Sequence, residues 1–196
     1  MNFGLQLKKW VPLAALALAC SMPAQAVDIG GVNVPDSATV AAKELKLNGA
    51  GMRALLFIKI YAIGLYTPEK KTTAADVQAL AGPRRVALHI QRETNSDEFG
   101  KLFIEGMNKN STAEEKAKVV GQTMKFGEMF ASLDPVKKGD VVTLDWIPGT
   151  GTVAQLNGKK IGETMPDIAF YNAVLRIWLG DSPAQESLKR ELLGGK

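Results

Sequence analysis

The segment Leu55–Tyr66 is rich in Leu, Ile, Phe and Tyr and gives the strongest strand prediction in the sequence. Its even positions from Leu56 to Ala62 are all apolar, whereas its odd positions mix apolar residues with Lys59 and Tyr61. Because side chains alternate between the two faces of a strand, the even positions are predicted to face the core. The preceding Gly49–Gly51 is predicted to interrupt the chain.

Other runs with strand-like composition lie near both ends of the chain. Asn157-Gly158 separates two of them and is typical of a two-residue hairpin turn, because both residues tolerate positive φ. The remaining predicted strands are a Gly-rich edge hairpin at Val27–Val34, then Leu45–Leu47, Arg84–Arg92, Asp140–Ile147, Thr152–Leu156 and Lys159–Thr164.

Helical periodicity occupies the middle and the end of the sequence. Asn95 and Ser96 can cap a helix, and Thr112 with Glu115 forms a capping box for the next one. The first of these helices has a predicted apolar stripe of Phe99, Leu102, Phe103 and Met107, and the second a predicted buried face of Val120, Met124, Phe126 and Phe130. Further helices are predicted at Thr73–Ala81, from Pro166 to Gly180, and from Ser182 to Gly194.

Strands at both ends with helices between them predict an α+β fold with a large antiparallel sheet. Helices are expected to cover one face of this sheet and to leave the other partly open. No internal repeat divides the sequence, so we expect one domain over residues 27–196.

The first 26 residues have the pattern of a cleavable export signal. Lys8 and Lys9 precede an apolar run from Trp10 to Cys20, and Ala24-Gln25-Ala26 fits a signal-peptidase site. The run is shorter than the roughly 20 residues that span a bilayer, and no later segment is long enough, so no membrane span is expected. We therefore predict cleavage after Ala26 and a periplasmic location, with lipoprotein processing at Cys20 as the weaker alternative.

Cleavage would change the chemistry that the chain can perform. It removes the only cysteine, Cys20, and lowers the formal net charge of +4 to +2 by removing Lys8 and Lys9. A chain with no cysteine and a single histidine, His89, supports neither a thiolate metal site nor a catalytic triad, so neither a metal nor another cofactor is expected. The weak positive net charge does not indicate a surface that binds nucleic acid.

Two neighbouring motifs resemble the chalcone isomerase superfamily: Gly49-Ala50-Gly51-Met52-Arg53, and then Lys59-Ile60-Tyr61-Ala62-Ile63-Gly64-Leu65-Tyr66. The late hairpin around Pro148–Thr152 and the helix containing Trp178-Leu179-Gly180 add to the likeness, which spans most of the chain. The resemblance implies an open-faced β-sandwich, a large antiparallel sheet backed by a helical layer. It also implies a cleft between that sheet and the helices, in which some relatives cyclise chalcones and others bind fatty acids without catalysis.

The resemblance also assigns roles to individual residues. Arg53 stands where the family has the arginine that orients the reacting oxyanion. Tyr61 stands where the enzymes have a threonine and the fatty-acid-binding relatives have a tyrosine that helps to hold a carboxylate. Phe99, Gly106 and Ile177 stand where the enzymes have a tyrosine, an asparagine and a threonine or serine, so three polar groups are missing.

We therefore predict a non-catalytic binding protein for a small apolar, fatty-acid-like carboxylate. Its ligand-binding residues would be Arg53, Tyr61, Lys59, Phe99 and Ile177, although a solvated strand position is the simpler interpretation of Lys59. A guanidinium in an apolar cleft pairs with a carboxylate in bidentate fashion, which gives it this role without catalysis.

Two alternatives stay open at this point. The chain could be an isomerase or intramolecular lyase for an unknown enone-like substrate, with Arg53 stabilising an oxyanion and Tyr61 donating a proton. It could also be an interaction module with a vestigial cleft, in which Arg53 pairs with Glu98 or Glu105.

Overall fold

The computed structural model describes residues 25–195, and the export signal predicted for residues 1–26 lies almost entirely outside them. A small hairpin, β1 (Ala26–Asp28) and β2 (Asn33–Pro35), comes first. The other elements follow in the order β3 (Ser37–Val40), β4 (Lys43–Leu55), β5 (Ile58–Thr67), α1 (Ala74–Ala79), β6 (Arg84–Ile90), α2 (Ser96–Lys109), α3 (Ala113–Ala131), β7 (Val141–Ile147), β8 (Gly151–Leu156), β9 (Lys159–Met165), α4 (Ile168–Leu179) and α5 (Glu186–Leu192).

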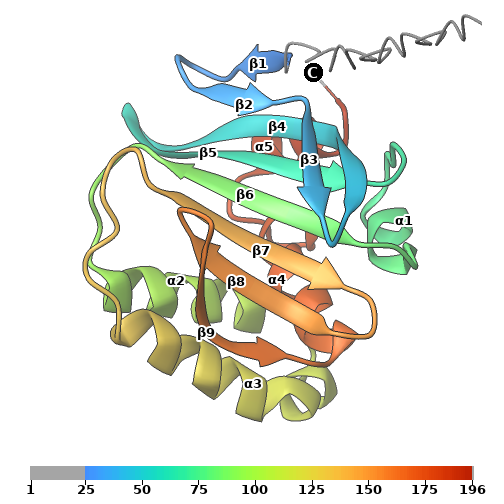
Figure 1. Cartoon of the computed structure of the whole chain (residues 1–196). Helices are drawn as coiled ribbons and strands as arrows, with labels where there is room; N and C mark the ends of the chain where they lie inside the picture. The colour runs from blue at the N-terminus through green and yellow to red at the C-terminus, as the bar shows by residue number, and fades with distance from the viewer. Residues whose placement is uncertain (1–24, 196) are drawn as a thin grey trace, which may run out of the picture.

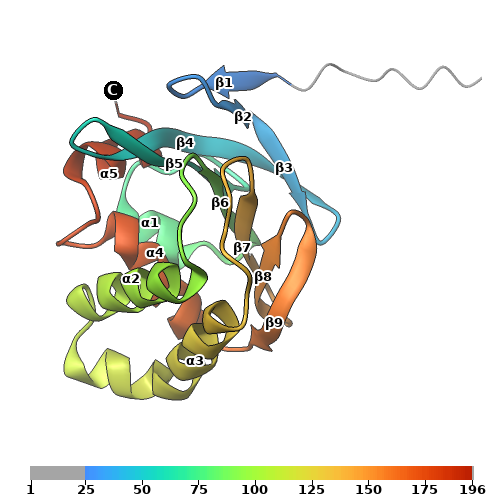
Figure 2. The ribbon, with the colours of Figure 1, turned by 90° about the vertical axis from the view of Figure 1, so that its left-hand side faces the viewer.

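Strands β3 to β9 form one seven-stranded sheet in which each strand pairs antiparallel with its neighbours in the sequence. Helices α2, α3 and α4 gather on one side of the curled sheet, as Figures 1 and 2 show. The predicted α+β class and helix-backed antiparallel sheet are confirmed. In residues 25–195, no helix is both long and apolar enough to cross a membrane.

The sheet buries apolar residues on both faces. The main core lies between the sheet and the helices and takes Tyr61, Ile63 and Leu65 from β5. A smaller core on the opposite face takes Ala62 and Tyr66 from the same strand and is completed by residues of β2, β3, β4 and β6. The prediction that the even positions of β5 face the main core is therefore wrong for Ala62, although Ile60 does pack against that core. The apolar pattern does not distinguish the two faces of β5, because the N-terminal strands bury the face that points away from the helices.

The prediction of one strand over Leu55–Tyr66 after a break at Gly49–Gly51 is also wrong. Strand β4 runs straight through the glycines, and Leu56 and Phe57 form the turn of a β4–β5 hairpin. The turn residue Leu56 has a φ of 54°, the left-handed conformation that sequence analysis assigns to Gly or Asn. The turn contains none of the Gly, Asn, Asp or Pro residues that usually mark turns. The apolar run therefore continues through the turn, and the predicted strand included it.

The predicted helix caps are confirmed, but the predicted helix faces are only partly right. Asn95 accepts hydrogen bonds from the backbone of Asp97 and Glu98, and Thr112 forms its capping box. Phe99, Phe103 and Met107 of α2 and Phe126 and Phe130 of α3 are buried, as expected. Leu102, Val120 and Met124 are instead exposed, because they lie outside the helix faces that carry the buried residues of α2 and α3.

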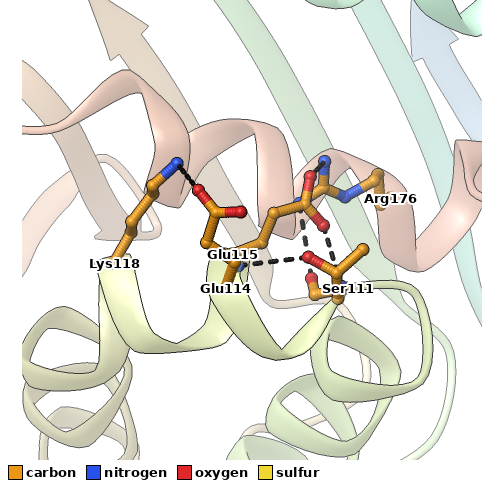
Figure 3. Close-up of polar contacts among 6 residues, drawn as sticks. Ser111, Glu114, Glu115, Lys118 and Arg176 are labelled. Atoms are coloured by element: carbon orange, nitrogen blue, oxygen red, sulfur yellow. Dashed lines mark hydrogen bonds and ion pairs between the residues drawn. The ribbon is translucent and has the colours of Figure 1, made fainter.

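An ion pair joins the start of α3 to α4. The Nη1 atom of Arg176 lies 2.9 Å from Oε1 of Glu115, and its Nη2 donates to Ser111 at 3.3 Å (Figure 3). The other carboxylate oxygen of Glu115 accepts from the backbone N–H of Thr112, so one side chain serves both the cap and the pair. The connection between α2 and α3 is thereby held against α4.

All three tyrosines of the chain have raised pKa values, which predicts how stability responds to alkali. Burial raises the pKa of Tyr66 to about 12 and also raises those of Tyr61 and Tyr171 above the ordinary value. The unfolded chain releases these protons at pH about 10. The folded state keeps them longer, so we expect stability to be complete below pH about 10 and to be lost as the pH rises toward the folded pKa values.

Phenolate absorbance in the near ultraviolet checks this expectation. In native protein the signal should stay low beyond pH about 10 and then rise together with the loss of circular dichroism, whereas protein in urea should titrate near pH 10. Native and urea-treated titration curves that coincide would contradict the burial of the tyrosines.

Candidate functional site

A cavity of about 580 Å³ opens between the end of the β4–β5 hairpin and the helical layer. Its lining comes from β4, β5, the loop before α2, α2 itself, α4 and residues 182–184 before α5. The buried floor consists of Tyr61, Phe99, Phe103 and Ile177. The rim is exposed and carries charged residues of both signs, Arg92, Lys109, Glu93, Glu98 and Glu105.

Arg53 and Tyr61 face the cavity from adjacent strands. They are direct partners in the antiparallel register of β4 and β5, immediately before an irregularity between Arg53 and Ala54. Directly opposed residues of such a pair project to the same side of the sheet, with Cβ atoms about 4.5–5.5 Å apart. The sheet therefore brings together the two polar residues that the sequence analysis singled out, and both line the cavity.

The guanidinium of Arg53 is half-buried and anchored at one nitrogen. Its Nη1 donates to the backbone oxygen of Ala54 at 2.8 Å and to Oε1 of Gln185 at 3.2 Å. None of the ion pairs found in residues 25–195 involves Arg53. The pairing of Arg53 with Glu98 or Glu105 that a vestigial cleft would require is absent there, although both acids lie on the rim.

The hydroxyl of Tyr61 is held by Trp178. The indole Nε1 donates to it at 3.0 Å in a buried hydrogen bond. This bond uses a lone pair of the oxygen, and within residues 25–195 the Tyr61 O–H itself donates no hydrogen bond. Burial raises the pKa of Tyr61, while the Trp178 hydrogen bond and the Arg53 charge oppose that rise. Tyr61 is therefore a neutral hydrogen-bond donor at physiological pH.

The wall opposite Arg53 is apolar. Phe99 packs against Phe103 with 5.0 Å between ring centroids and against Phe130 in an edge-on arrangement at 5.5 Å. Phe103 in turn contacts Trp178 edge-on at 5.5 Å. Ile177 reaches the same floor from α4. These positions offer a ligand contact area without a hydroxyl or an amide.

Lys59 does not lie with the other four predicted residues. Its side chain is absent from the cavity lining, and its Nζ donates to the backbone oxygen of Gly30 at 2.7 Å on an exposed surface. Lys59 projects from the face of β5 that carries the N-terminal hairpin. The structure thus brings together Arg53, Tyr61, Phe99 and Ile177 and leaves Lys59 outside.

Two residues that the sequence analysis missed support Arg53. Gln185 precedes α5, and its Oε1 accepts from both Arg53 and the backbone N–H of Ala54. Asn48 is 1% exposed and sits at an irregularity of the β4–β5 register, where its amide nitrogen donates to the backbone oxygens of Lys71 and Leu192 at 2.9 and 2.7 Å. No sequence motif marks these contacts, because Gln185 and Arg53 lie 132 positions apart and Asn48 and Leu192 lie 144 positions apart.

The Gly-x-Gly motif permits this support. A Cβ on Gly49 would meet the backbone oxygens of Glu191 and Leu192, and one on Gly51 would collide with the side chain of Glu191. Figures 1 and 2 both show α5 lying against β4. The glycines therefore admit the C-terminal helix to the strand, and that helix brings Gln185 to Arg53.

Metal-ligating side chains do not gather in the described part of the chain. Across residues 25–195, no group of three or more His, Cys, Asp or Glu side chains is placed to hold a metal ion. His89 lies in β6, away from the cavity lining, and burial lowers its pKa. The site therefore offers a cation, a neutral donor and apolar walls.

A comparison with protein families gives this site a context. The family described as chalcone isomerase-like matches residues 26–194. The chain belongs to this family. No curated protein sequence resembles the chain closely enough to count as a match.

Among solved structures, this chalcone isomerase-like protein is similar to a fatty-acid binding protein of Arabidopsis thaliana. The TM-score is 0.62 at 15% sequence identity, over 83% of this chain and 92% of that chain. At this identity the likeness establishes the shared fold. The fold resemblance drawn from the Gly-x-Gly-x-Arg stretch is thereby confirmed.

Substituting Gly49 tests the role of the glycines. We expect Gly49→Ala to lower the free energy of unfolding by about 1–3 kcal/mol, because its methyl group would overlap the last turn of α5. Urea unfolding followed by circular dichroism measures the change. Gly121→Ala in α3 is the matched control, because apart from the local backbone of α3 nothing in residues 25–195 lies within 4 Å of its added methyl group.

The control should move in the opposite direction. Alanine inside an exposed helix stabilises relative to glycine by about 0.5–1 kcal/mol. If Gly49→Ala proved as harmless as Gly121→Ala, the close approach of α5 to β4 would not be a constraint on the fold.

Proposed function

We propose that the protein binds a small apolar carboxylate, fatty-acid-like in chemistry, in the cavity beside Arg53 and does not transform it. The proposal rests on one observation, a half-buried guanidinium that faces the cavity and pairs with no acid among residues 25–195. A cavity of about 580 Å³ falls within the roughly 300–1,000 Å³ of small-molecule sites.

The residues divide the work between the two ends of such a ligand. Gln185 and Ala54 occupy Nη1 of Arg53, which leaves Nε and Nη2 to donate to a carboxylate. Tyr61 can add its O–H, because Trp178 donates to the oxygen and does not compete for the proton. The hydrocarbon part would lie along Phe99, Phe103 and Ile177, where burial of apolar surface is favourable.

The same groups make catalysis the less favoured function. Arg53 and Tyr61 could stabilise an oxyanion, but the buried floor otherwise consists of Phe99, Phe103 and Ile177, which neither donate nor accept protons. The raised pKa of Tyr61 keeps its proton in place, so it does not serve as a base at neutral pH. The carboxylates of the site lie on the exposed rim, away from Tyr61.

Removing the guanidinium tests the binding function. We expect Arg53→Ala to weaken the binding of a long-chain fatty acid by about tenfold or more, since a hydrogen bond to a charged group contributes about 1.5–3 kcal/mol. Tyr61→Phe should weaken it less, because a neutral donor is lost. Titration calorimetry measures both. Lys59→Ala removes an equal charge outside the cavity and should leave the affinity unchanged.

Three outcomes would contradict the proposal. Equal losses for Arg53→Ala and Lys59→Ala would show general charge attraction. Full affinity in Arg53→Ala would place the carboxylate elsewhere. Turnover of chalcones or other enones by the wild-type protein, abolished in Arg53→Ala, would favour the isomerase or lyase alternative.

We also propose that the protein works in the periplasm after cleavage behind Ala26. The basic pair Lys8 and Lys9, the apolar run and the Ala24-Gln25-Ala26 site support export. The family match begins at residue 26, which supports a functional domain that starts where the signal ends. Ala26 itself pairs with Pro35 at the first position of β1, so cleavage would trim the hairpin by one residue pair.

N-terminal sequencing of the exported protein measures this directly. Expression of the full chain in a Gram-negative host should give a periplasmic protein that begins at Val27. Ala26→Leu should block processing, because the cleavage site requires small residues. A cytoplasmic product that begins at Met1 would contradict the export signal, and a mature protein that begins at a lipid-modified Cys20 would favour the lipoprotein alternative.

A further inference from the structure

The end of the β4–β5 hairpin exposes four consecutive apolar residues, here called the tip (Leu55–Ile58). Leu55, Leu56, Phe57 and Ile58 have exposed fractions of 59%, 87%, 100% and 44%. Figure 2 shows this hairpin end at the outside of the molecule, above α5 and α2. Single exposed apolar residues are ordinary, but a contiguous apolar group marks an interaction site.

The turn itself would accept more polar residues. Leu56 occupies the first central position with a φ of 54°, where glycine adopts the conformation with less strain. Phe57 occupies the second position and is fully exposed. The backbone geometry of the turn therefore does not account for either side chain, and neither does packing within the chain.

The tip is continuous with the mouth of the cavity. Leu55 belongs to the tip and also lines the cavity, and Ile60 extends the lining inward along β5. Across the opening, the exposed Leu102 of α2 lines the same rim. An apolar path therefore runs from the tip past Leu55 and Ile60 to the floor at Tyr61.

We propose that the tip inserts into the interfacial region of a lipid bilayer and so places the cavity mouth against the membrane. The tip is small for a protein partner. Crediting each side chain with the about 150–250 Å² of an aromatic residue, and scaling by the exposed fractions, leaves it short of the about 800 Å² that each partner of a standard interface buries. A bilayer needs no matching surface, only apolar side chains that reach below the headgroups.

The cavity rim carries charges of both signs, but the charged residue that adjoins the tip in sequence, Lys59, fits a membrane surface. Lys59 follows the tip directly, with its ammonium group exposed and fixed by Gly30. A lysine at the base of an inserted apolar loop keeps its charge at headgroup level, where anionic lipids attract it. This gives Lys59 a position at the membrane surface, although it lies outside the cavity.

Insertion of the tip into a bilayer does not depend on what the cavity binds. The role that we give to this insertion, ligand exchange with the membrane, rests on the proposed function. Fatty-acid-like ligands partition into bilayers, so a cavity that opens at the membrane exchanges them without passing their chains through water. Binding to vesicles free of fatty acid tests the docking alone, whereas the affinity of Arg53→Ala tests the ligand site. The two proposals can therefore fail separately.

A fluorescent probe on the tip tests insertion. Nitrobenzoxadiazole is attached to Phe57→Cys in a Cys20→Ala background, and vesicles of phosphatidylethanolamine and phosphatidylglycerol are added. We expect a blue shift, a rise in emission and quenching by lipids with spin labels on their acyl chains. Met124→Cys carries the control probe, because Met124 is exposed on α3, away from the tip. An unchanged probe at position 57, or equal responses at both positions, would overturn the proposal.

A tip variant that keeps the fold gives the second test. Leu56→Gly with Phe57→Ser creates a glycine-led hairpin turn, relieves the positive φ at position 56 and removes the two most exposed apolar side chains. In co-sedimentation with the same vesicles, the affinity of the exported protein carrying these changes should be at least about tenfold lower than that of wild type. Val120→Ser with Met124→Ser, on α3, should bind as wild type does.

Sedimentation velocity without lipid distinguishes the other occupants. We expect the wild type and the tip variant to sediment alike. Wild-type protein that self-associates through the tip, shown by dissociation in the tip variant, would assign the surface to a second copy and overturn the membrane proposal. Equal vesicle binding by the wild type and the tip variant would overturn it as well.

Discussion

The site depends on the contact between the backbone of β4 and the last helix of the chain. Gly49 and Gly51 have no side chain to separate them from α5. Along this contact, here called the seam between β4 and α5, Asn48 donates to the backbone oxygen of Leu192. Gln185, at the start of the same helix, reaches Ala54 and Arg53. The position of the guanidinium is therefore set by close packing of backbone against backbone, and a single methyl group at the seam would disturb it.

The chemistry of the cavity follows from how its donors are already occupied. The Nη1 atom of Arg53 donates to Ala54 and Gln185, which holds the side chain in place. The Nε and Nη2 atoms take no part in these two hydrogen bonds. Trp178 donates a hydrogen bond to the Tyr61 oxygen and orients it, and this bond does not use the Tyr61 hydrogen. Part of the Arg53 guanidinium and the Tyr61 O–H thus remain as hydrogen-bond donors at the cavity, and such donors are the groups that recognise an anion. The rim carries Glu93, Glu98 and Glu105 beside Arg92 and Lys109, whereas the buried floor of Tyr61, Phe99, Phe103 and Ile177 carries no carboxylate.

The sequence predicted the fold class, the helix caps and the hairpin at Asn157-Gly158, because these rest on local chemistry and on a family motif. It also placed Arg53, Tyr61, Phe99 and Ile177 near one another through the resemblance, and the structure gathers all four around one cavity. It failed at the turn of Leu56 and Phe57, where apolar residues replace the usual turn residues, and at the face of β5, where both sides are buried. Gln185 and Asn48 could not be found, since their partners are remote in sequence.

The order of the strands gives the last helix a special place in folding. Neighbouring strands of the main sheet are consecutive in the chain, so the sheet can form progressively from β3 to β9. The hydrogen bond between Asn48 and Leu192 instead joins residues 144 positions apart, so it forms only after almost the whole domain has been made. A chain that is still being synthesised can thus possess a nearly complete sheet while Arg53 still lacks its Gln185 anchor. The anchoring of Arg53 at the cavity is therefore completed only after the last helix has been made and has packed against β4.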